Sequence, residues 1–308
     1  MRLQNHFSRF LLTTTLVVSS FVAPAQVVKV DSASKWKKAF KAGLNLNQAA
    51  FTSNWKGGGA NSFGITTFLS FKANYKGENN SWDNEIDMQY GMINNQGLGY
   101  RKTLDRIFLD TRYGHALNKK WDLSASANFL TQFAPGFKYL KAKSGIDSLI
   151  PLSDFLAPAF LTVGLGFEYH PVDYFKLRLS PIAPRLTIVN NVAHFISADN
   201  PTPYGLSPNR TARMDWFAFQ MLAEFDKDIA KNVNIKWRYI LFANYEKLNI
   251  DDLYHRLDLN ITAKLGRFMN ASLGTILLYD RNQDNGVQVS QAFSMGVLYT
   301  FQNYVEKK

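Results

Sequence analysis

The chain contains no cysteine. Disulfide frameworks, thiolate zinc sites, iron–sulfur clusters and cysteine nucleophiles are therefore excluded. Histidine is also scarce, with five residues among 308. Only 19% of the residues are charged, whereas 46% are hydrophobic and 14% aromatic. This composition is too apolar and too aromatic for a disordered chain, and it indicates a folded, β-rich protein.

Long hydrophobic runs are missing after the first 25 residues, because charged residues interrupt every later apolar stretch. A helix needs about 20 mostly apolar residues to cross a bilayer. The mean hydropathy of −0.19 is likewise too polar for a bundle of membrane helices. The net charge of +11 raises the question of nucleic-acid binding. We expect no nucleic-acid partner, because the sequence has neither a basic helix nor an aromatic RNA-binding strand motif.

The first 25 residues have the features of an export signal. Arg2 and Arg9 supply positive charge, residues 10–23 are mostly apolar and uncharged, and Ala23 and Ala25 are small residues at cleavage positions. A membrane anchor is the alternative, but a stretch of about 14 residues is too short to span a bilayer as a helix. We therefore expect residues 1–25 to be a cleaved signal peptide and residues 26–35 to form a short periplasmic tail.

The rest of the sequence alternates between apolar and polar residues. Between Trp36 and Leu46, for example, most even positions are apolar, and lysine and asparagine occupy odd positions. Such a period of two predicts strands rather than helices. Twelve runs follow this pattern: 36–46, 63–75, 82–90, 107–113, 121–133, 161–169, 175–179, 217–225, 233–241, 257–265, 271–279 and 293–301.

These runs predict an all-β fold, an antiparallel up-and-down transmembrane β-barrel of about 12 strands over residues 36–304, in the cell outer membrane. An even strand number, strands of about 10 residues and alternating short and long connections are typical of outer-membrane barrels. A soluble β-sandwich also alternates, but it does not explain so many runs. The long, external connections are expected at residues 51–62, 94–102, 134–157 and 190–212.

Aromatic residues provide a second test, because outer-membrane barrels carry aromatic girdles at both membrane interfaces. Trp36, Trp82 and Trp121 each begin a run on its apolar side, whereas Tyr75 and Tyr113 each end one. All five positions adjoin the expected tail or a short connection. We therefore expect a girdle on the periplasmic side, with the apolar faces of the strands toward lipid and the polar faces toward the lumen.

The polar faces carry many charges of both signs, and acidic residues concentrate on the third run. Its three carboxylates share one side and would be costly in lipid, so they are expected to face the lumen and pair with bases of adjacent strands. The predicted charge ladder comprises Lys72, Asp83, Glu85, Asp87, Arg106 and Arg112. Two interpretations stay open: a structural ion-pair network in a narrow barrel, and a selective pore or solute site.

The seventh run is followed closely by Pro181 and Pro184. Proline cannot donate a hydrogen bond to a neighbouring strand and favours the edges and ends of strands. We therefore expect the pairing of this strand to break or bulge at these prolines.

Patterns for catalysis, metals and cofactors are weak, and none of the three is predicted. The strand pattern brings no histidine to a lumenal serine with an acid behind it, as a Ser–His–Asp unit requires. A lipid-modifying enzyme assembled across strands and loops remains an alternative. Residues 280–286 offer oxygen ligands at alternate positions, which suits calcium, but a polar hairpin loop is the simpler interpretation. Gly57–Gly59 lacks the Lys-Ser/Thr that follows a phosphate loop.

Basic residues gather in or beside the expected external loops. Their charge suggests contacts with the phosphates of lipopolysaccharide, in addition to outer-membrane lipid as a partner. Ordinary solvated loop charge is the alternative. The residues are Lys56, Arg101, Lys102, Lys138, Lys141, Lys143, Arg210 and Arg213.

Several segments resemble a family of unknown function among Bacteroidota outer-membrane barrel proteins. The resemblance implies an outer-membrane location and no established activity or functional residues. It departs at residues 191–213 and 250–254, where this sequence differs from the pattern. The segments that carry it are 55–62, 104–105, 110–114, 131–133, 153–158, 179–181 and 241–245.

Three functions follow from these observations. We expect first a narrow pore or binding channel for a small polar solute. The second is a structural or interaction barrel with a plugged lumen, serving envelope or surface assembly. A lipid-modifying enzyme is the third. An open path wider than a water molecule favours transport, whereas a lumen filled by side chains or by residues 134–157 favours the structural barrel.

Overall fold

The computed structural model describes residues 26–28, 34–51, 61–140, 148–196, 200–266 and 269–304. The predicted signal peptide and Gly57–Gly59 lie outside the described residues. Within them, no helix is long and apolar enough to cross a membrane.

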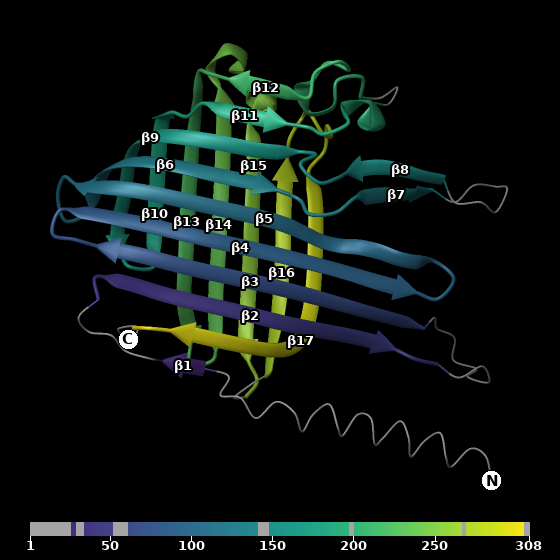
Figure 1. Ribbon diagram of the computed structural model, residues 1–308, viewed down its shortest axis with the longest axis horizontal. Helices are drawn as coiled ribbons and strands as arrows, with labels where there is room; N and C mark the ends of the chain where they lie inside the picture. The colour runs from purple at the N-terminus through teal and green to yellow at the C-terminus, as the bar shows by residue number, and fades with distance from the viewer. Residues whose placement is uncertain are drawn as a thin grey trace, which may run out of the picture.

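Twelve antiparallel strands form a closed ring, in which each strand pairs with the next ring strand along the chain (Figure 1). The ring closes where the last strand pairs with the first. The predicted antiparallel up-and-down barrel of about 12 strands is thus confirmed. Its strands are β2 (Trp36–Ala49), β3 (Ser62–Lys76), β4 (Asn80–Asn95), β5 (Gly99–Ala116), β6 (Trp121–Thr131), β9 (Ala159–Val172), β10 (Phe175–Ile182), β13 (Ala218–Ala230), β14 (Val233–Asn244), β15 (Tyr254–Lys264), β16 (Met269–Tyr279) and β17 (Gln288–Gln302).

The remaining elements belong to the loops and to the ends of the ring. A hairpin of β7 and β8 lies between β6 and β9. Short 3-10 helices lie in the connection between β11 and β12 and in the connection between β14 and β15. These elements are β1 (Gln26–Val28), β7 (Gly136–Leu140), β8 (Ser148–Ser153), β11 (Arg185–Ile188), η1 (Val192–Phe195), η2 (Pro203–Gly205), β12 (Ala212–Asp215), η3 (Tyr245–Lys247) and η4 (Ile250–Asp252).

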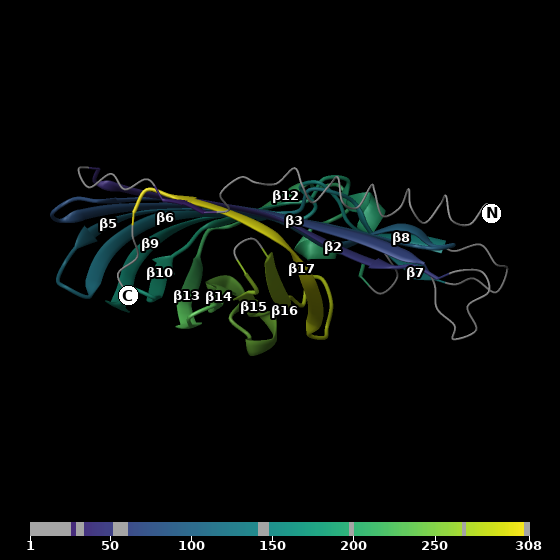
Figure 2. The same ribbon diagram turned by 90° about the horizontal axis from the view of Figure 1, so that it is seen from below.

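The barrel has two facing walls. Strands β2 to β6 cross in front of β13 to β16 in Figure 1, and Figure 2 shows the same two groups one above the other. Side chains reach from one wall to the other: Lys236 of β14 lies 2.7 Å from Glu85 of β4. Because β4 and β14 are not neighbours in the ring, this contact bridges the lumen and shows that it is narrow there.

The alternating faces point as the sequence predicts. On the outer face, Leu123 and Leu165 are each 49% exposed. On the inner face, Asp122, Ser124 and Glu168 of the same strands are buried. Strand residues of opposite parity must point to opposite sides of a sheet, and on these strands the polar set faces the interior.

The predicted periplasmic girdle follows the strand register. Trp36, Tyr75, Trp82 and Tyr113 lie directly opposite one another in turn across β2, β3, β4 and β5. The ring centroids of Trp36 and Tyr75 are 5.4 Å apart, and those of Trp36 and Trp82 are 5.9 Å apart. Trp121 continues the pattern against Tyr169, with ring centroids 4.8 Å apart. The girdle therefore contains two groups of touching rings at this end of the barrel, one on β2 to β4 and one on β6 and β9.

Two sequence expectations about connections differ from the structure. Residues 94–102 do not form a long loop, because Gly97 and Gly99 adopt φ of 79° and 69° and close a tight turn. Strands β4 and β5 therefore extend as a hairpin. Gln26–Val28, expected within a tail, instead form β1 parallel to the end of β17. Strand β17 extends past Val297, its last residue paired with β16, and leaves an edge that β1 fills.

Proline interrupts the seventh ring strand as predicted. Strand β10 ends at Ile182 and β11 begins at Arg185, and the register against β9 shifts between Leu179 and Ile182. Beside the shift, a Cβ on Gly166 would lie 2.0 Å from the carbonyl oxygen of Leu179. The bulged backbone thus approaches β9 so closely that only glycine fits there.

Candidate functional site

The three carboxylates of β4 face the lumen, and each has a basic partner. Asp83 lies 2.8 Å from Lys176 and 3.7 Å from Arg112. Asp87 lies 2.7 Å from Arg106. The two contacts with β5 involve the adjacent strand, as the antiparallel order predicts.

Other partners of the charge ladder come from the opposite wall. Glu85 contacts Lys236 at 2.7 Å and Arg238 at 2.6 Å, both on β14. Lys72 lies directly opposite Glu85 in the strand register, yet it pairs with Asp226 of β13 at 3.2 Å. In a narrow barrel, facing walls are as close as adjacent strands. Three of the five basic residues that contact the β4 carboxylates could not be assigned from strand order alone, because Lys176, Lys236 and Arg238 lie on strands that are not adjacent to β4.

A second group of charges surrounds Arg112. Its guanidinium contacts Asp122 and lies 3.3 Å from Glu168, and its side chain is 2% exposed. Glu168 also contacts Arg178, which holds Asp110 with two hydrogen bonds of 2.9 and 3.1 Å. Charged hydrogen bonds of this kind compensate the cost of burying each ion. The group joins β5, β6, β9 and β10 into one network.

An apolar layer, not predicted from the sequence, lies within the lumen. Phe108 of β5 lies between the lumenal Arg106 and Asp110, and is 1% exposed. The guanidinium carbon of Arg238 lies 4.0 Å from the centre of its ring, at cation–π distance. The layer comprises Phe108, Leu130, Ala218, Leu222, Ile240, Phe242 and Tyr254, with Phe160 and Leu278 packed against it. The parity of Phe108 was the available signal, because every second residue from Arg106 to Arg112 faces inward.

Side chains therefore fill this part of the lumen. Arg112, Phe108, Glu168 and Gln220 are each no more than 2% exposed. Gln220 bridges to Asn128 across strands at 2.8 Å. A filled lumen favours the structural or interaction barrel with a plugged lumen.

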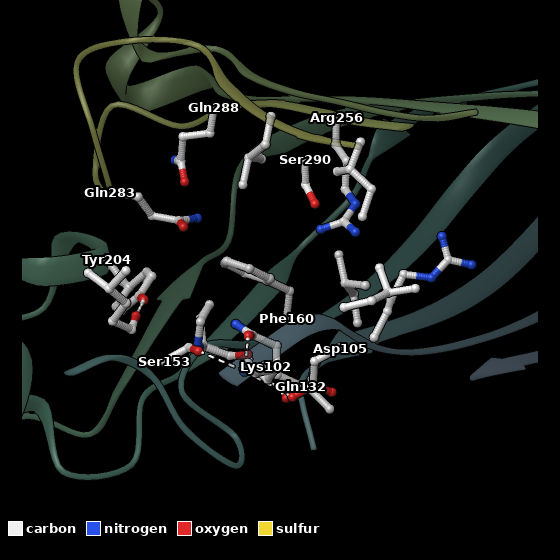
Figure 3. A pocket seen from close by; sticks show the side chains of 18 of the residues that line it. Lys102, Asp105, Gln132, Ser153, Phe160, Tyr204, Arg256, Gln283, Gln288 and Ser290 are labelled. Atoms are coloured by element: carbon white, nitrogen blue, oxygen red, sulfur yellow. Dashed lines mark hydrogen bonds and ion pairs between the residues drawn. The ribbon is translucent and has the colours of Figure 1, made fainter. Parts of the chain in front are cut away.

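A cavity of about 280 Å³ lies beside the apolar layer, toward the external loops (Figure 3). Arg256, Gln283, Gln288 and Ser290 line one side, and Lys102 lies on the side across from them. The guanidinium of Arg256 lies 3.1 Å from Asp258, which in turn lies 2.8 Å from Arg106. Amide, hydroxyl and guanidinium groups on these walls can hydrogen-bond a small polar molecule.

Lys102 holds the loop side of this cavity together. Its Nζ donates to Asp105, Gln132, Ser153 and the carbonyl oxygen of Ala134, at distances of 2.6 to 3.1 Å. From its sequence position, Lys102 is expected among the loop cations available to lipopolysaccharide. That expectation is wrong for Lys102, because β5 continues through this position and turns its side chain inward.

The connection before β12 packs on the β8 segment and forms an external cap. Its core comprises Ala157, Val189, Val192, Tyr204 and Leu206, with Phe195 packed against it. The hydroxyl of Tyr204 donates to the carbonyl oxygen of Leu152 at 2.8 Å. Burial raises the pKa of Tyr204, because the ionised phenol would lose its hydration. Tyr204 thus stays a neutral donor that ties the two connections together.

The candidate calcium loop uses its carboxylates internally. Asp280 accepts hydrogen bonds from the backbone and side-chain amides of Asn282 and from Gln283. Asp284 accepts from the backbone of Gly286. In the described part of the chain, no group of three or more histidine and acidic residues is placed to hold a metal ion. The geometry fits the hairpin interpretation of residues 280–286.

The histidines show no catalytic arrangement among the described residues. His115 contacts Asn80, His170 contacts Asp122, and His255 contacts the Tyr239 hydroxyl on the outer face. None of these contacts joins a histidine to a serine. The absence of enzymatic activity stays a prediction.

Comparisons with known proteins find a family whose pattern matches part of the chain, and solved structures of similar fold. The pattern of a family described as proteins of unknown function (DUF3078) matches residues 46–137. No curated protein sequence matches the chain. The family match covers β3 to β6 and therefore includes the whole predicted charge ladder.

Solved outer-membrane proteins are similar in fold. An outer-membrane channel from Pseudomonas putida F1 has 8% identity and a TM-score of 0.36, with 89% of this chain and 100% of that chain covered. The NanC porin has 9% identity and a TM-score of 0.38, with 84% and 98% covered. The translocator domain of autotransporter NalP from Neisseria meningitidis has 12% identity and a TM-score of 0.33, with 86% of each chain covered. The assignment of the barrel rests on the strand pairing of this chain itself.

Proposed function

We propose that this protein is an outer-membrane β-barrel that binds a small polar solute in the 280 Å³ cavity and lets it pass when the side chains that fill the narrow, charged lumen move aside. The lipid-facing apolar strands and the aromatic girdle support the outer-membrane location. Membership in a Bacteroidota family of such barrels is part of the proposal, supported by the match over residues 46–137. Outer-membrane lipid is the expected partner, and exposed Lys138 and Arg210 remain candidates for lipopolysaccharide.

The cavity is the observation that carries the solute hypothesis. It adjoins Arg256 and the Arg106–Asp258 pair, so a molecule bound there meets the top of the ion-pair network. On its wall, the buried Nε2 of Gln288 has no hydrogen-bond partner among the described residues. Because Gln288 lines the cavity, a turn of its side chain would offer this unused amide donor to a ligand with an acceptor oxygen.

The filled lumen supports a second candidate, a structural or interaction barrel. Ion pairs between facing walls brace the barrel, and they leave each lumenal charge compensated without a solute. The two candidates differ in whether any solute passes.

Uptake into liposomes tests the first candidate. We expect vesicles containing the purified protein to take up urea and glycerol faster than empty vesicles, and to exclude sucrose. Gln288→Leu should slow glycerol uptake, whereas Gln291→Leu, on the exposed outer face of the same strand, should leave it unchanged. Lack of uptake for all three solutes would refute passage and leave the structural barrel.

Ion selectivity tests whether the charge ladder acts on permeation. In a planar bilayer, Asp87→Asn removes a carboxylate that contacts Arg106 and Lys236, so the lumen becomes more positive. We expect the cation-to-anion permeability ratio to fall relative to the unmodified protein. Asp284→Asn, in the external hairpin, is the matched control. An unchanged ratio would leave the ladder a purely structural element.

A further inference from the structure

Arg185 differs from the other buried arginines of the barrel. Arg106, Arg112, Arg178 and Arg238 each form ion pairs with carboxylates. Arg185 is equally buried, with 5% exposure, and forms no ion pair with any described residue. A buried cation without a counter-ion is costly, so its charge needs another source of compensation.

Aromatic rings supply part of this compensation. The guanidinium carbon of Arg185 lies 3.4 Å from the ring centre of Phe242, 5.1 Å from that of Tyr254 and 5.4 Å from that of Phe160. Cation–π contacts stabilise a guanidinium, but they do not use its N–H donors. The rings instead hold the group in one plane and leave its edge available.

The donors of Arg185 are mostly unused. Its Nε donates to the hydroxyl of Thr162 at 3.0 Å, and Nη1 and Nη2 make no hydrogen bond to any described residue. The carboxylate of Asp215, opposite Arg185 in the strand register, is held instead by Arg213 and by the side-chain amide of Asn244. Asp280 is likewise occupied by its own loop. Two free terminal NH2 groups in a fixed fork match the geometry of an oxyanion.

A second cavity, of about 80 Å³, adjoins this guanidinium. Its lining includes Thr187 and three basic residues, Arg185, Arg213 and Lys247. Of these three, Lys247 is exposed and lies in a loop. The acids on its wall are Asp252 and Asp280. The first lies 3.8 Å from Arg281 and the second is bound within its loop. The cavity has room for a few water molecules, or for an oxyanion of similar size.

We propose that the Arg185 cavity is a binding site for a small oxyanion, a carboxylate or phosphate group, held by the two terminal N–H groups of the guanidinium. The group would accept two parallel hydrogen bonds from Arg185 and would supply the missing counter-charge. Phe160, Tyr204 and Tyr254 line both cavities. The oxyanion is therefore either a free ion or the charged end of a solute whose remainder occupies the larger cavity. The site does not require an open lumen.

Titration of the purified, folded full-length barrel in detergent tests the proposal. Sodium phosphate, sodium acetate and the sugar acid glucuronate are titrated calorimetrically at constant ionic strength, with chloride as the replaced anion. We expect saturable binding of at least one of the three. Tighter binding of glucuronate than of acetate assigns the carboxylate to a larger solute, whereas equal binding of the two assigns it to a free ion.

Variants locate the binding. Arg185→Met should weaken binding at least tenfold, and Arg185→Lys should weaken it about threefold or more, because lysine keeps the charge but lacks the planar fork. Lys231→Met, at an exposed lysine in the turn between β13 and β14, should bind like the unmodified protein. Circular dichroism establishes whether each variant is folded. If Arg185→Met does not fold, the anion affinity of Arg185→Lys decides whether Arg185 binds the anion.

Two results would overturn the site. One is the absence of saturable binding of all three anions to the unmodified protein, which would mean that water alone occupies the cavity. The other is binding of unchanged strength in the folded Arg185 variants, which would place the anion elsewhere. Either result leaves solute uptake through the lumen untouched, since that is measured with neutral urea and glycerol.

Discussion

Substitution of Arg178 by methionine probes the ion pairs that hold the walls of the barrel. Arg178 of β10 reaches Asp110 of β5 with two hydrogen bonds and Glu168 of β9 with one contact of 3.3 Å. All three side chains are buried, with 2 to 8% exposure. Methionine preserves much of the volume but removes the charge, so the buried carboxylates lose a partner.

The size of the expected loss in unfolding free energy follows from the ion pairs that each carboxylate keeps. Glu168 keeps Arg112 at 3.3 Å, whereas Asp110 has no other ion-pair partner in the described part of the chain. Removing one member of a buried pair costs about 3–5 kcal/mol. With one stranded carboxylate, we expect Arg178→Met to lower the free energy of unfolding by about 3 kcal/mol, the lower end of that range.

Guanidinium unfolding of the barrel in detergent, followed by circular dichroism, measures this loss. For a guanidinium m-value of about 4 kcal/mol per molar, the midpoint should fall by somewhat less than about 1 M. Adding Asp110→Asn should recover part of the loss, because the stranded charge is removed. Arg281→Met is the exposed control and should stay within about 0.5 kcal/mol of the unmodified protein. A loss below about 1 kcal/mol for Arg178→Met would refute the view that the network braces the lumen.

Three further predictions concern packing and loops. Phe108→Ala should lower the free energy of unfolding by about 3–5 kcal/mol in the same assay, because it empties the apolar layer; a loss below about 1 kcal/mol would contradict the burial of its ring. Gly166→Ala should cost about 1–3 kcal/mol, because its Cβ would meet the backbone oxygen of Leu179, and an unchanged midpoint would argue against the bulge. Lys102→Met should speed proteolytic cleavage between β7 and β8 severalfold without unfolding the ring, because four hydrogen bonds to the loop side are lost; equal cleavage rates would show that Lys102 does not hold that segment.

Much of the barrel follows from the order of residues alone. A period of two decides which side of each strand is apolar, and that is why the girdle from Trp36 to Tyr113 could be predicted together with the strand number. Proline chemistry likewise predicts the interruption near Pro184. These features depend on residues a few positions apart, so they need no knowledge of the distant chain.

The partners of the lumenal charges depend on the closed fold. The sequence by itself determined that Asp83, Glu85 and Asp87 face inward, because parity is local. Only the tertiary structure decided that Glu85 meets Lys236 and Arg238, since these residues are about 150 positions apart and their distance depends on how far the two walls approach. The same approach encloses Arg185 among aromatic rings from three other strands, which no spacing within one strand could reveal.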